Sequence, residues 1–298
     1  MHRRSFIHQS SFALGALTLS QQKMINLLFD DPYKITMLRN NMGIFTEKGG
    51  TIAFLLAKKE IVVVDSQFPE QANHLIKELK KQSANPISLL INTHHHADHT
   101  SGNISFKELT PHVLAHANSK TNQQRVAKEK NNEDQQLYPD RIFTDTWCED
   151  AGKEKICLNY FGAGHTDGDA LVHFQHADIV HMGDLVFNRR HPFIDRSAGA
   201  NIKSWIAVLD AAIKKYNRNT IFIYGHAAEG YDVKGDREDL KAFSNYLEKL
   251  IAFAEAELRA GKSKEEFLKN KTIPGVTEWK GDGIERPLTA AYDEVTSK

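Results

Sequence analysis

A dense run of metal-binding side chains lies in the first half of the chain, in the sequence THHHADHTSGN of residues 93–103. It follows directly after the apolar residues 87–91, which predict a buried strand. In extended backbone, side chains two positions apart point to the same side, so His94 and His96 can bind one cation while His95 points away. Imidazole nitrogen is a common ligand of zinc. The segment therefore predicts part of a metal centre.

Five further candidate ligands follow this pair. Asp98 and His99 come after the chain turns, where they can face a second cation. The other three share a local pattern, in which a short apolar strand ends at a small residue directly before a metal-binding side chain. They are Gly164-His165 after residues 158–161, Gly183-Asp184 after 179–182 and Gly225-His226 after 221–224. Strands hold ligands rigidly, and glycine lets the backbone approach a metal closely. We predict seven metal ligands: His94, His96, Asp98, His99, His165, Asp184 and His226.

The elements that must position these ligands alternate between strands and helices. Strands are predicted over residues 34–39, 43–46, 51–57 and 61–65, and again between 144 and 182 and at 220–224. Helical spacing of apolar residues predicts a helix after Pro69 and two more beyond residue 201. Residues 117–135 are polar and predict a helix followed by a loop. We expect one α/β domain over residues 23–298, with two sheets packed face to face and helices outside.

The ligand motifs together resemble the metallo-β-lactamase superfamily, from about residue 30 to the C-terminal region. The matching sequences are HHHADH at residues 94–99, GHTDGD at 164–169, MGD at 182–184 and GH at 225–226, with Val64-Asp65 as the usual early strand end. The resemblance implies the metallo-β-lactamase fold, a four-layer αββα sandwich. It also implies how the ligands divide: His94, His96 and His165 bind one zinc ion, Asp98, His99 and His226 bind another, and Asp184 bridges both. Asp65 would hold the ligand loop without binding metal.

The resemblance also implies a chemistry. Two zinc ions about 3.5 to 4 Å apart share a water whose pKa falls toward 7, which supplies hydroxide as a nucleophile. Asp98 is then the candidate catalytic residue that shuttles the proton. Aspartate at position 184 departs from the β-lactamases proper, which usually carry Cys or Ser there, and is typical of glyoxalase II, lactonase and phosphodiesterase relatives. We expect a binuclear zinc hydrolase of esters, thioesters or lactones, with β-lactams as further substrates.

Two other functions stay open at this point. Persulfide dioxygenases of the same fold use overlapping ligands around a single iron, so a mononuclear iron oxidoreductase is the alternative. A metal-binding protein without enzymatic activity is less favoured, because structural zinc sites are closed, four-coordinate and rich in cysteine. The predicted ligand set has seven members and no cysteine.

The bulk composition favours a small-molecule substrate. The 38 basic and 38 acidic side chains cancel, so no long-range field attracts nucleic acid or an anionic membrane surface. A neutral or mixed substrate fits this balance. The chain contains no apolar run near the roughly 18 residues that a membrane span needs.

The first twenty residues, MHRRSFIHQSSFALGALTLS, resemble a twin-arginine export signal. Arg3, Arg4 and Phe6 stand at the motif positions, and a short, mildly apolar stretch without acidic residues follows. We expect residues 1–22 to be a signal peptide of a bacterial protein. Export through the twin-arginine translocase would place the protein in the periplasm or outside the cell.

The two cysteines, Cys148 and Cys157, flank a predicted hairpin turn at Gly152, so they would lie opposite each other. A disulfide and a pair of half-buried thiols both fit this arrangement.

Several other polar residues are predicted to support the site or to lie on the surface. The histidines in this class are His112, His116, His173, His176 and His181. Asp167 and Asp169 are expected to fix the loop of His165, and Tyr224 is expected in the core. Residues 187–195 should border the pocket. There, Arg189, Arg190, His191 and Phe193 either meet the substrate or remain in solvent.

Overall fold

The first half of the chain builds a seven-stranded sheet. The computed structural model describes residues 32–281 and 283–297. The strand order of this sheet is β1-β2-β3-β4-β5-β6-β7. These strands span Lys34–Met37, Met42–Thr46, Ile52–Leu56, Ile61–Val64, Ile87–Ile91, Val113–His116 and Arg141–Phe143. Strands β2 to β4 pair antiparallel through short turns, whereas β4 to β7 pair parallel because helical segments connect them.

The second half builds a six-stranded sheet with the order β15-β13-β11-β10-β9-β8. In chain order, strands β8 to β11, β13 and β15 span Thr146–Ala151, Glu154–Asn159, Leu171–Phe174, Ile179–His181, Ile221–Ile223 and Lys234–Gly235. A separate parallel pair joins β12 (Phe187–Asn188) to β14 (His226–Ala227). This pair lies beyond the ends of β11 and β13, so it brings the segments after those two strands together.

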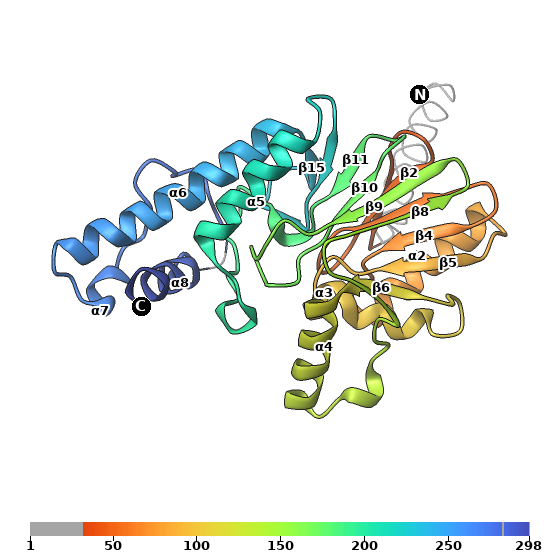
Figure 1. The fold of residues 1–298 in the computed structure, drawn as a ribbon, viewed down its shortest axis with the longest axis horizontal. Helices are drawn as coiled ribbons and strands as arrows, with labels where there is room; N and C mark the ends of the chain where they lie inside the picture. Colours follow the sequence, from red (N-terminus) through yellow and green to blue (C-terminus); the bar gives the residue numbers. More distant parts are fainter. Residues whose placement is uncertain (1–31, 282, 298) are drawn as a thin grey trace, which may run out of the picture. The chain divides into compact units, whose positions relative to one another are not determined.

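Helices lie outside the sheets. Helices α2 (Pro69–Gln82), α3 (Ala97–Thr100) and α4 (Ala117–Lys130) connect strands of the first sheet. Helix α2 buries Ala72, Leu75 and Leu79 and lies against that sheet (Figure 1). Helices α5 (Ile202–Lys215), α6 (Arg237–Arg259), α7 (Lys264–Phe267) and α8 (Glu285–Thr296) belong to the second half. Helix α6 lies along α5 and α8 (Figure 1).

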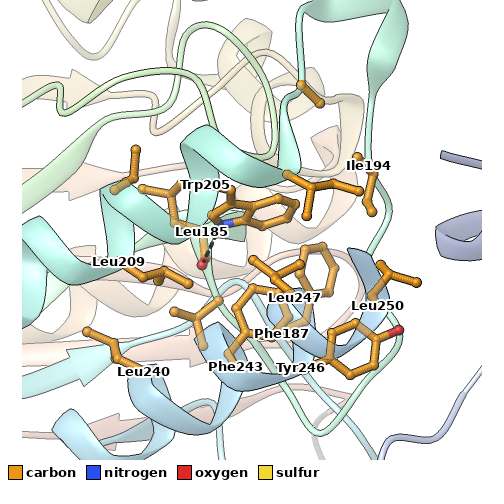
Figure 2. Packing of buried hydrophobic residues seen from close by; sticks show 14 of the residues in the cluster. Leu185, Phe187, Ile194, Trp205, Leu209, Leu240, Phe243, Tyr246, Leu247 and Leu250 are labelled. Carbon is orange, nitrogen blue, oxygen red and sulfur yellow. Dashed lines mark hydrogen bonds between the residues drawn. The ribbon is translucent and has the colours of Figure 1, made fainter. Parts of the chain in front are cut away.

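Two apolar cores hold these layers together. The first lies between the sheets, where Ile44 and Leu89 of the first sheet join Leu158 and Ile179 of the second. The second core packs α5, α6 and α8 on the other face of the second sheet. Figure 2 shows its centre, where Trp205 of α5 donates a hydrogen bond from Nε1 to the carbonyl of Leu185 at 3.0 Å. The layers therefore follow the order αββα, which confirms the predicted fold class.

The predicted secondary structure is mostly confirmed. The strands expected before residue 66, the helix after Pro69 and the strand near residue 221 all form. Helix α8 is not predicted. The short pair of β12 and β14 is not predicted either, because strands of two residues show no periodicity. No helix in the described part of the chain is long and apolar enough to cross a membrane. The predicted export signal, with Arg3, Arg4 and Phe6, lies outside the described residues.

The two cysteines form a disulfide. Cys148 of β8 and Cys157 of β9 are direct cross-strand partners, with Cα atoms 4.2 Å apart. The hairpin turns at Gly152, which has a positive φ of 63° that glycine adopts without strain. The open choice between a disulfide and two thiols is thereby resolved in favour of the disulfide.

Candidate metal centre

Four strand ends bring the candidate ligands to one edge of the sheets. Strand β5 leads to His94 and to helix α3, strand β9 leads into the loop of His165, β11 leads to Asp184, and β13 leads to His226. Two groups of metal-binding atoms form there, each with all of its atoms within 4.8 Å of one another. The first group is His94, His96, His165 and Asp184, and the second is Asp98, His99 and His226. The structure thus brings all seven predicted ligands together.

The first group converges through its imidazole nitrogens. His96 Nδ1 lies 3.1 Å from His94 Nε2 and 2.8 Å from His165 Nε2. The carboxylate of Asp184 completes the group, with Oδ2 at 3.5 Å from His165 Nε2 and 4.0 Å from His94 Nε2. Three imidazoles and one carboxylate oxygen are a donor set that suits zinc.

The same carboxylate also reaches the second group. Asp184 Oδ1 lies 3.0 Å from His99 Nε2, and Oδ2 lies 3.4 Å from His226 Nε2. Asp98 closes this group from the other side, because its Oδ2 is 3.1 Å from His226 Nε2 and 3.8 Å from His99 Nε2. Asp184 therefore stands between the two groups, with oxygens directed at both.

Two buried atoms at the junction of the groups test whether a cation fits there. His99 Nε2 and Asp184 Oδ1 lie 3.0 Å apart, yet neither makes a hydrogen bond of acceptable geometry within residues 32–281 and 283–297. Buried polar atoms without partners are rare and need an explanation, such as a bound ion. A divalent cation held by each group would satisfy these atoms, so the residues present fit a pair of metal ions.

Asp65 holds the ligand loop. Its Oδ1 accepts a hydrogen bond from the backbone of Thr93 at 2.8 Å, and its Oδ2 accepts from Thr93 Oγ1 at 2.8 Å. The same Oδ2 lies 2.7 Å from His99 Nδ1. A hydrogen bond to the far ring nitrogen fixes the tautomer of a metal-binding histidine and aims the other nitrogen at the metal. This is the supporting role that the resemblance implies for Asp65.

The segment after Asp184 supports two more ligands in the same way. The carbonyl oxygen of Phe193 lies 2.7 Å from His165 Nδ1, and Asp195 Oδ2 lies 2.9 Å from His96 Nε2. Both histidines therefore turn their remaining nitrogen toward the first group.

Glycine is required where the backbone passes closest to the ligands. A Cβ atom on Gly225 would lie 1.9 Å from Asp184 Oδ1, and one on Gly50 would lie 2.1 Å from His99 Cε1. Both distances are far below van der Waals contact. The expected close approach of glycine backbone to the metal centre is thus present at Gly225.

A cavity of about 470 Å³ opens over the two groups. Its lining includes Asp98, Asp184 and His226, together with parts of residues 187–195 and of helix α4. The prediction that residues 187–195 border the pocket is confirmed. We call this space the central cavity.

The family comparison agrees with this geometry. The family model of the metallo-β-lactamase superfamily matches residues 46–226, which contain all seven predicted ligands. The chain belongs to the metallo-β-lactamase superfamily.

Curated members of the superfamily resemble the chain at low identity. The metallo-β-lactamase IND-1 of Chryseobacterium indologenes is 23% identical over 198 residues, which cover 63% of this chain and 80% of that protein. The metallo-β-lactamase type 2 of Bacillus cereus is 26% identical over 205 residues, which cover 66% of this chain and 77% of that protein. Membership and these relatives support a metal-dependent hydrolase.

Solved structures of the superfamily share the fold. A metallo-β-lactamase from Pontibacter korlensis has a TM-score of 0.62 at 19% identity and covers 72% of this chain and 99% of its own. The structure of metallo-β-lactamase IND-7 has a TM-score of 0.59 at 21% identity and covers 74% of this chain and 99% of its own. At these identities, the likeness shows the fold alone.

The pKa values of two histidines in the first group favour metal binding. Burial, together with the neighbouring His96, lowers the pKa of His165 to about 3. Burial and the neighbouring His99 hold the pKa of His94 well below its ordinary value. Both imidazoles are therefore neutral near pH 7, which is the form that binds a metal.

The second group holds protons that a cation would displace. Burial disfavours charge on His226, but the carboxylates of Asp184 and Asp98 outweigh burial and raise its pKa to about 9. Burial raises the pKa of Asp98, whereas His99 and His226 outweigh that effect and lower it to about 2. Binding of a cation here replaces the proton on His226, so it should release protons.

The histidines that were predicted not to be metal ligands have other partners. His181 is fully buried, lies 2.9 Å from the carbonyl of Thr51 and accepts a hydrogen bond from the backbone of Gly183 at 3.0 Å. His116 begins helix α4 and accepts a hydrogen bond from the backbone of Asn118. His112 pairs with Asp140. None of these three belongs to a group of metal-binding atoms in the described chain.

The expected structural residues behave as predicted at two positions. Asp169 accepts hydrogen bonds from the backbone and hydroxyl of Thr166 at 2.9 and 2.7 Å, which fixes the loop of His165. Tyr224 is fully buried, and its hydroxyl donates to the carboxylate of Asp239 at 3.1 Å. Tyr224 is therefore a core residue.

Of the four side chains predicted to meet the substrate or remain in solvent, three line the central cavity and one does not. Arg190, His191 and Phe193 line the central cavity. Arg189 does not line it, because its guanidinium lies 4.9 Å from the ring centre of Trp279 and forms an ion pair with Asp239 at 3.6 Å. Arg189 is thus directed toward Trp279 and Asp239 and not into the central cavity.

One supporting residue is absent from the prediction. Asp195 bonds His96 and also lies 3.5 Å from His95 Nε2, so these three residues form a further cluster beside the first group. The only local signal at Asp195 is that of a cap, since Oδ1 accepts from the backbone of Ser197 and Ala198. Its contact with a ligand 99 positions away has no sequence signature.

Proposed function

We propose that this protein is a binuclear zinc hydrolase that acts on a small carbonyl substrate. Asp184 carries the proposal, because it is one buried carboxylate with oxygens directed at both groups of ligands. His94, His96 and His165 would hold one ion, Asp98, His99 and His226 would hold the other, and Asp184 would bridge them. When bound, such a pair supplies Lewis acidity and a hydroxide nucleophile near neutral pH.

The protein groups contribute position and proton transfer. Asp65, Asp195 and the Phe193 carbonyl fix the ligand rings, so the site is formed before the substrate arrives. The side chain of Asp98 is 29% exposed, in contrast to 5% for Asp184. Asp98 therefore faces the central cavity and can accept a proton and deliver it to a leaving group.

The bridging aspartate favours esters, thioesters and lactones as substrates. An aspartate at the position of Asp184 is typical of superfamily relatives that hydrolyse such substrates. The two curated relatives, from Chryseobacterium indologenes and Bacillus cereus, are metallo-β-lactamases. We include β-lactams as further substrates, because all of these reactions begin with attack of hydroxide on a carbonyl carbon.

Metal analysis and hydrolysis of a substrate panel test the proposal. We expect two zinc ions per chain, hydrolysis of at least one ester, thioester, lactone or β-lactam, and loss of activity on chelation. In Asp184→Ser, we expect weaker zinc binding and a changed substrate preference. His173→Gln is the matched control, because His173 lies on β10 and contacts Tyr216 away from both groups.

Three results would refute the proposal. They are fewer than two metal ions per chain at full loading, activity that survives chelation, and rates in Asp184→Ser equal to those of the unchanged protein. Oxygen consumption by iron-loaded protein with a persulfide would instead identify an oxidoreductase.

We also propose that the protein is exported to the periplasm or beyond the cell. The disulfide of Cys148 and Cys157 supports this proposal, because disulfides persist in oxidising compartments. Fractionation of cells that express the full chain tests it, with Arg3→Lys and Arg4→Lys together as the variant that should stop export. Cytoplasmic location of both proteins would contradict it.

A further inference from the structure

Positive side chains from three separate elements surround the central cavity. Arg125 and Lys130 come from helix α4, Arg190 follows strand β12, and Arg286 lies in helix α8. The whole chain has equal numbers of basic and acidic residues. This concentration of positive charge is therefore local to the cavity and does not follow from the composition.

Three of these four basic side chains form no ion pair within the described chain. Arg125 pairs with Glu129 at 2.9 Å, so these two residues neutralise each other. Lys130, Arg190 and Arg286 form no ion pair with any residue that the structure describes. The acids that line the cavity deeper down are the candidate ligands Asp98 and Asp184, and Asp195, which is bonded to His96. Bound cations would neutralise the candidate ligands.

The C-terminal part of the chain holds the backbone beside Arg190 and supplies Arg286. Lys280 pairs with the chain beside Arg190, because its backbone N–H donates to Arg189 at 2.8 Å and its carbonyl accepts from His191 at 2.9 Å. Arg286 follows six residues later, at the start of α8. The family model ends at residue 226. Arg286 is thus contributed by a part of the chain outside the matched family region.

The remaining lining of the cavity is partly apolar. Phe187, Pro192, Phe193 and Val126 belong to this lining. Phe193 is 43% exposed, which is unusual for a large apolar side chain at a cavity. A ligand with an apolar body could cover it, since burying such a ring is favourable.

From these observations we propose that the substrate carries an oxyanion, either a carboxylate or a phosphate, on a partly apolar body, and that Arg190 and Arg286, with Lys130, bind that oxyanion. The inference rests on the proposed function, since it names the substrate class of the same site. It replaces the neutral or mixed substrate expected from the composition. Guanidinium groups suit this role because their planar donors match the geometry of both oxyanions.

Binding of matched probes to the zinc-loaded protein tests the inference without turnover. The probes are 2-naphthoate, its neutral analogue 2-naphthamide and 2-naphthylmethylphosphonate, and titration calorimetry measures their dissociation constants. In the double variant Arg190→Gln and Arg286→Gln, we expect the dissociation constant of naphthoate, of the phosphonate or of both to rise about ten-fold. That of naphthamide should change less than about two-fold. The anion with the larger loss identifies carboxylate or phosphate as the natural group.

Two control variants separate local charge from other effects. Lys107→Gln with Lys128→Gln removes the same number of charges, but neither residue lines the cavity. This control should leave all three dissociation constants unchanged. Arg190→Lys with Arg286→Lys keeps the charges but loses the planar donors, so it should weaken binding of the anions less than the glutamine double variant does.

Two results would overturn the inference. One is unchanged anion binding in the glutamine double variant, which would mean that the anions bind the metal ions alone. The other is equal loss in the lysine and glutamine double variants, which would exclude charge as the cause. Arginine-dependent anion binding by a protein that hydrolyses nothing in the panel would instead refute the proposed function and leave the anion site standing.

Discussion

Replacing Asp195 by asparagine tests whether the loop after Asp184 controls the first metal group. Asp195 Oδ2 lies 2.9 Å from His96 Nε2, while Oδ1 accepts from the backbone of Ser197 and Ala198. Burial raises the pKa of Asp195, but hydrogen bonds from His95, His96 and Ser197 outweigh it and hold the pKa far below its ordinary range. The carboxylate is therefore ionised at every pH at which the protein would work.

Asparagine separates the two roles of this side chain. Its carbonyl oxygen can still accept from the backbone at Ser197, so the cap is retained. Its amide nitrogen cannot accept a hydrogen bond from His96 Nε2, so the ring loses the partner that turns Nδ1 toward the first group. Loss of such a partner typically weakens metal binding about 10- to 100-fold. This range corresponds to about 1.4 to 2.8 kcal/mol and agrees with the roughly 1.5 to 3 kcal/mol of a hydrogen bond to a charged group.

Competition with a chromophoric zinc chelator measures the effect. We expect one of the two zinc ions to bind about 10- to 100-fold more weakly in Asp195→Asn, while the other is nearly unaffected. Ser197→Ala is the matched control, since it removes the contact from the Ser197 hydroxyl to Asp195 Oδ1 at 2.5 Å and leaves His96 untouched. Two dissociation constants within about two-fold of the unchanged protein would show that Asp195 does not orient His96.

Three further predictions address other parts of the chain. Burial lowers the pKa of His116, so below a pH of about 6.5 the unfolded chain binds the proton more readily than the folded chain, and the free energy of unfolding decreases as the pH decreases. Urea unfolding of the metal-free protein at pH 7.5 and 5.5 should show a smaller decrease in His116→Asn than in the unchanged protein. An equal decrease in both proteins would contradict this prediction. Gly225→Ala forces a Cβ onto the carboxylate of Asp184, so metal analysis should find fewer than two zinc ions, and full occupancy would show that the backbone can move. Replacing both Cys148 and Cys157 by serine should lower the free energy of unfolding by about 2 kcal/mol with unchanged zinc content; loss of zinc would show that the hairpin supports the metal centre.

The seven candidate ligands can be predicted from the sequence because each one has a local signal. His94 and His96 have the two-residue spacing of extended backbone after an apolar strand. His165, Asp184 and His226 each directly follow a glycine in the segment after a strand. At Gly225 the reason is steric, since no larger residue fits beside Asp184. Local backbone geometry and close approach of the backbone thus restrict which residues can occupy these positions, so the sequence alone reveals them.

The groups that hydrogen-bond to the ligands have no such local signal. The carbonyl of Phe193 accepts from His165, and any residue at position 193 would offer that carbonyl. Asp195 meets His96 across 99 positions of sequence. Both contacts exist only because the chain after β12 folds back over the first group. They depend on the tertiary arrangement, so they could not be predicted from composition or spacing.

The substrate expected from the composition and the proposed oxyanion site differ for a related reason. The net charge counts all charged side chains and contains no information on where they lie, whereas a substrate contacts only those at the cavity. Lys130, Arg190 and Arg286 are far apart in sequence and lie at one cavity only after folding. A chain with balanced charge can therefore carry a local cluster of positive side chains.

Helix α8 connects the proposed oxyanion site with the candidate metal centre through one segment. Glu294 of α8 forms an ion pair with Arg196 at 3.0 Å and accepts hydrogen bonds from the backbone of Ile202 and Lys203 at the start of α5. The side chain of Glu294 is only 6% exposed, so this junction is shielded from solvent. Arg196 directly follows Asp195, which holds His96. A shift of α8 would therefore move both Arg286 of this helix and the carboxylate of Asp195 beside the candidate ligand His96. If both proposals hold, substrate binding at Arg286 and metal binding at His96 should depend on each other.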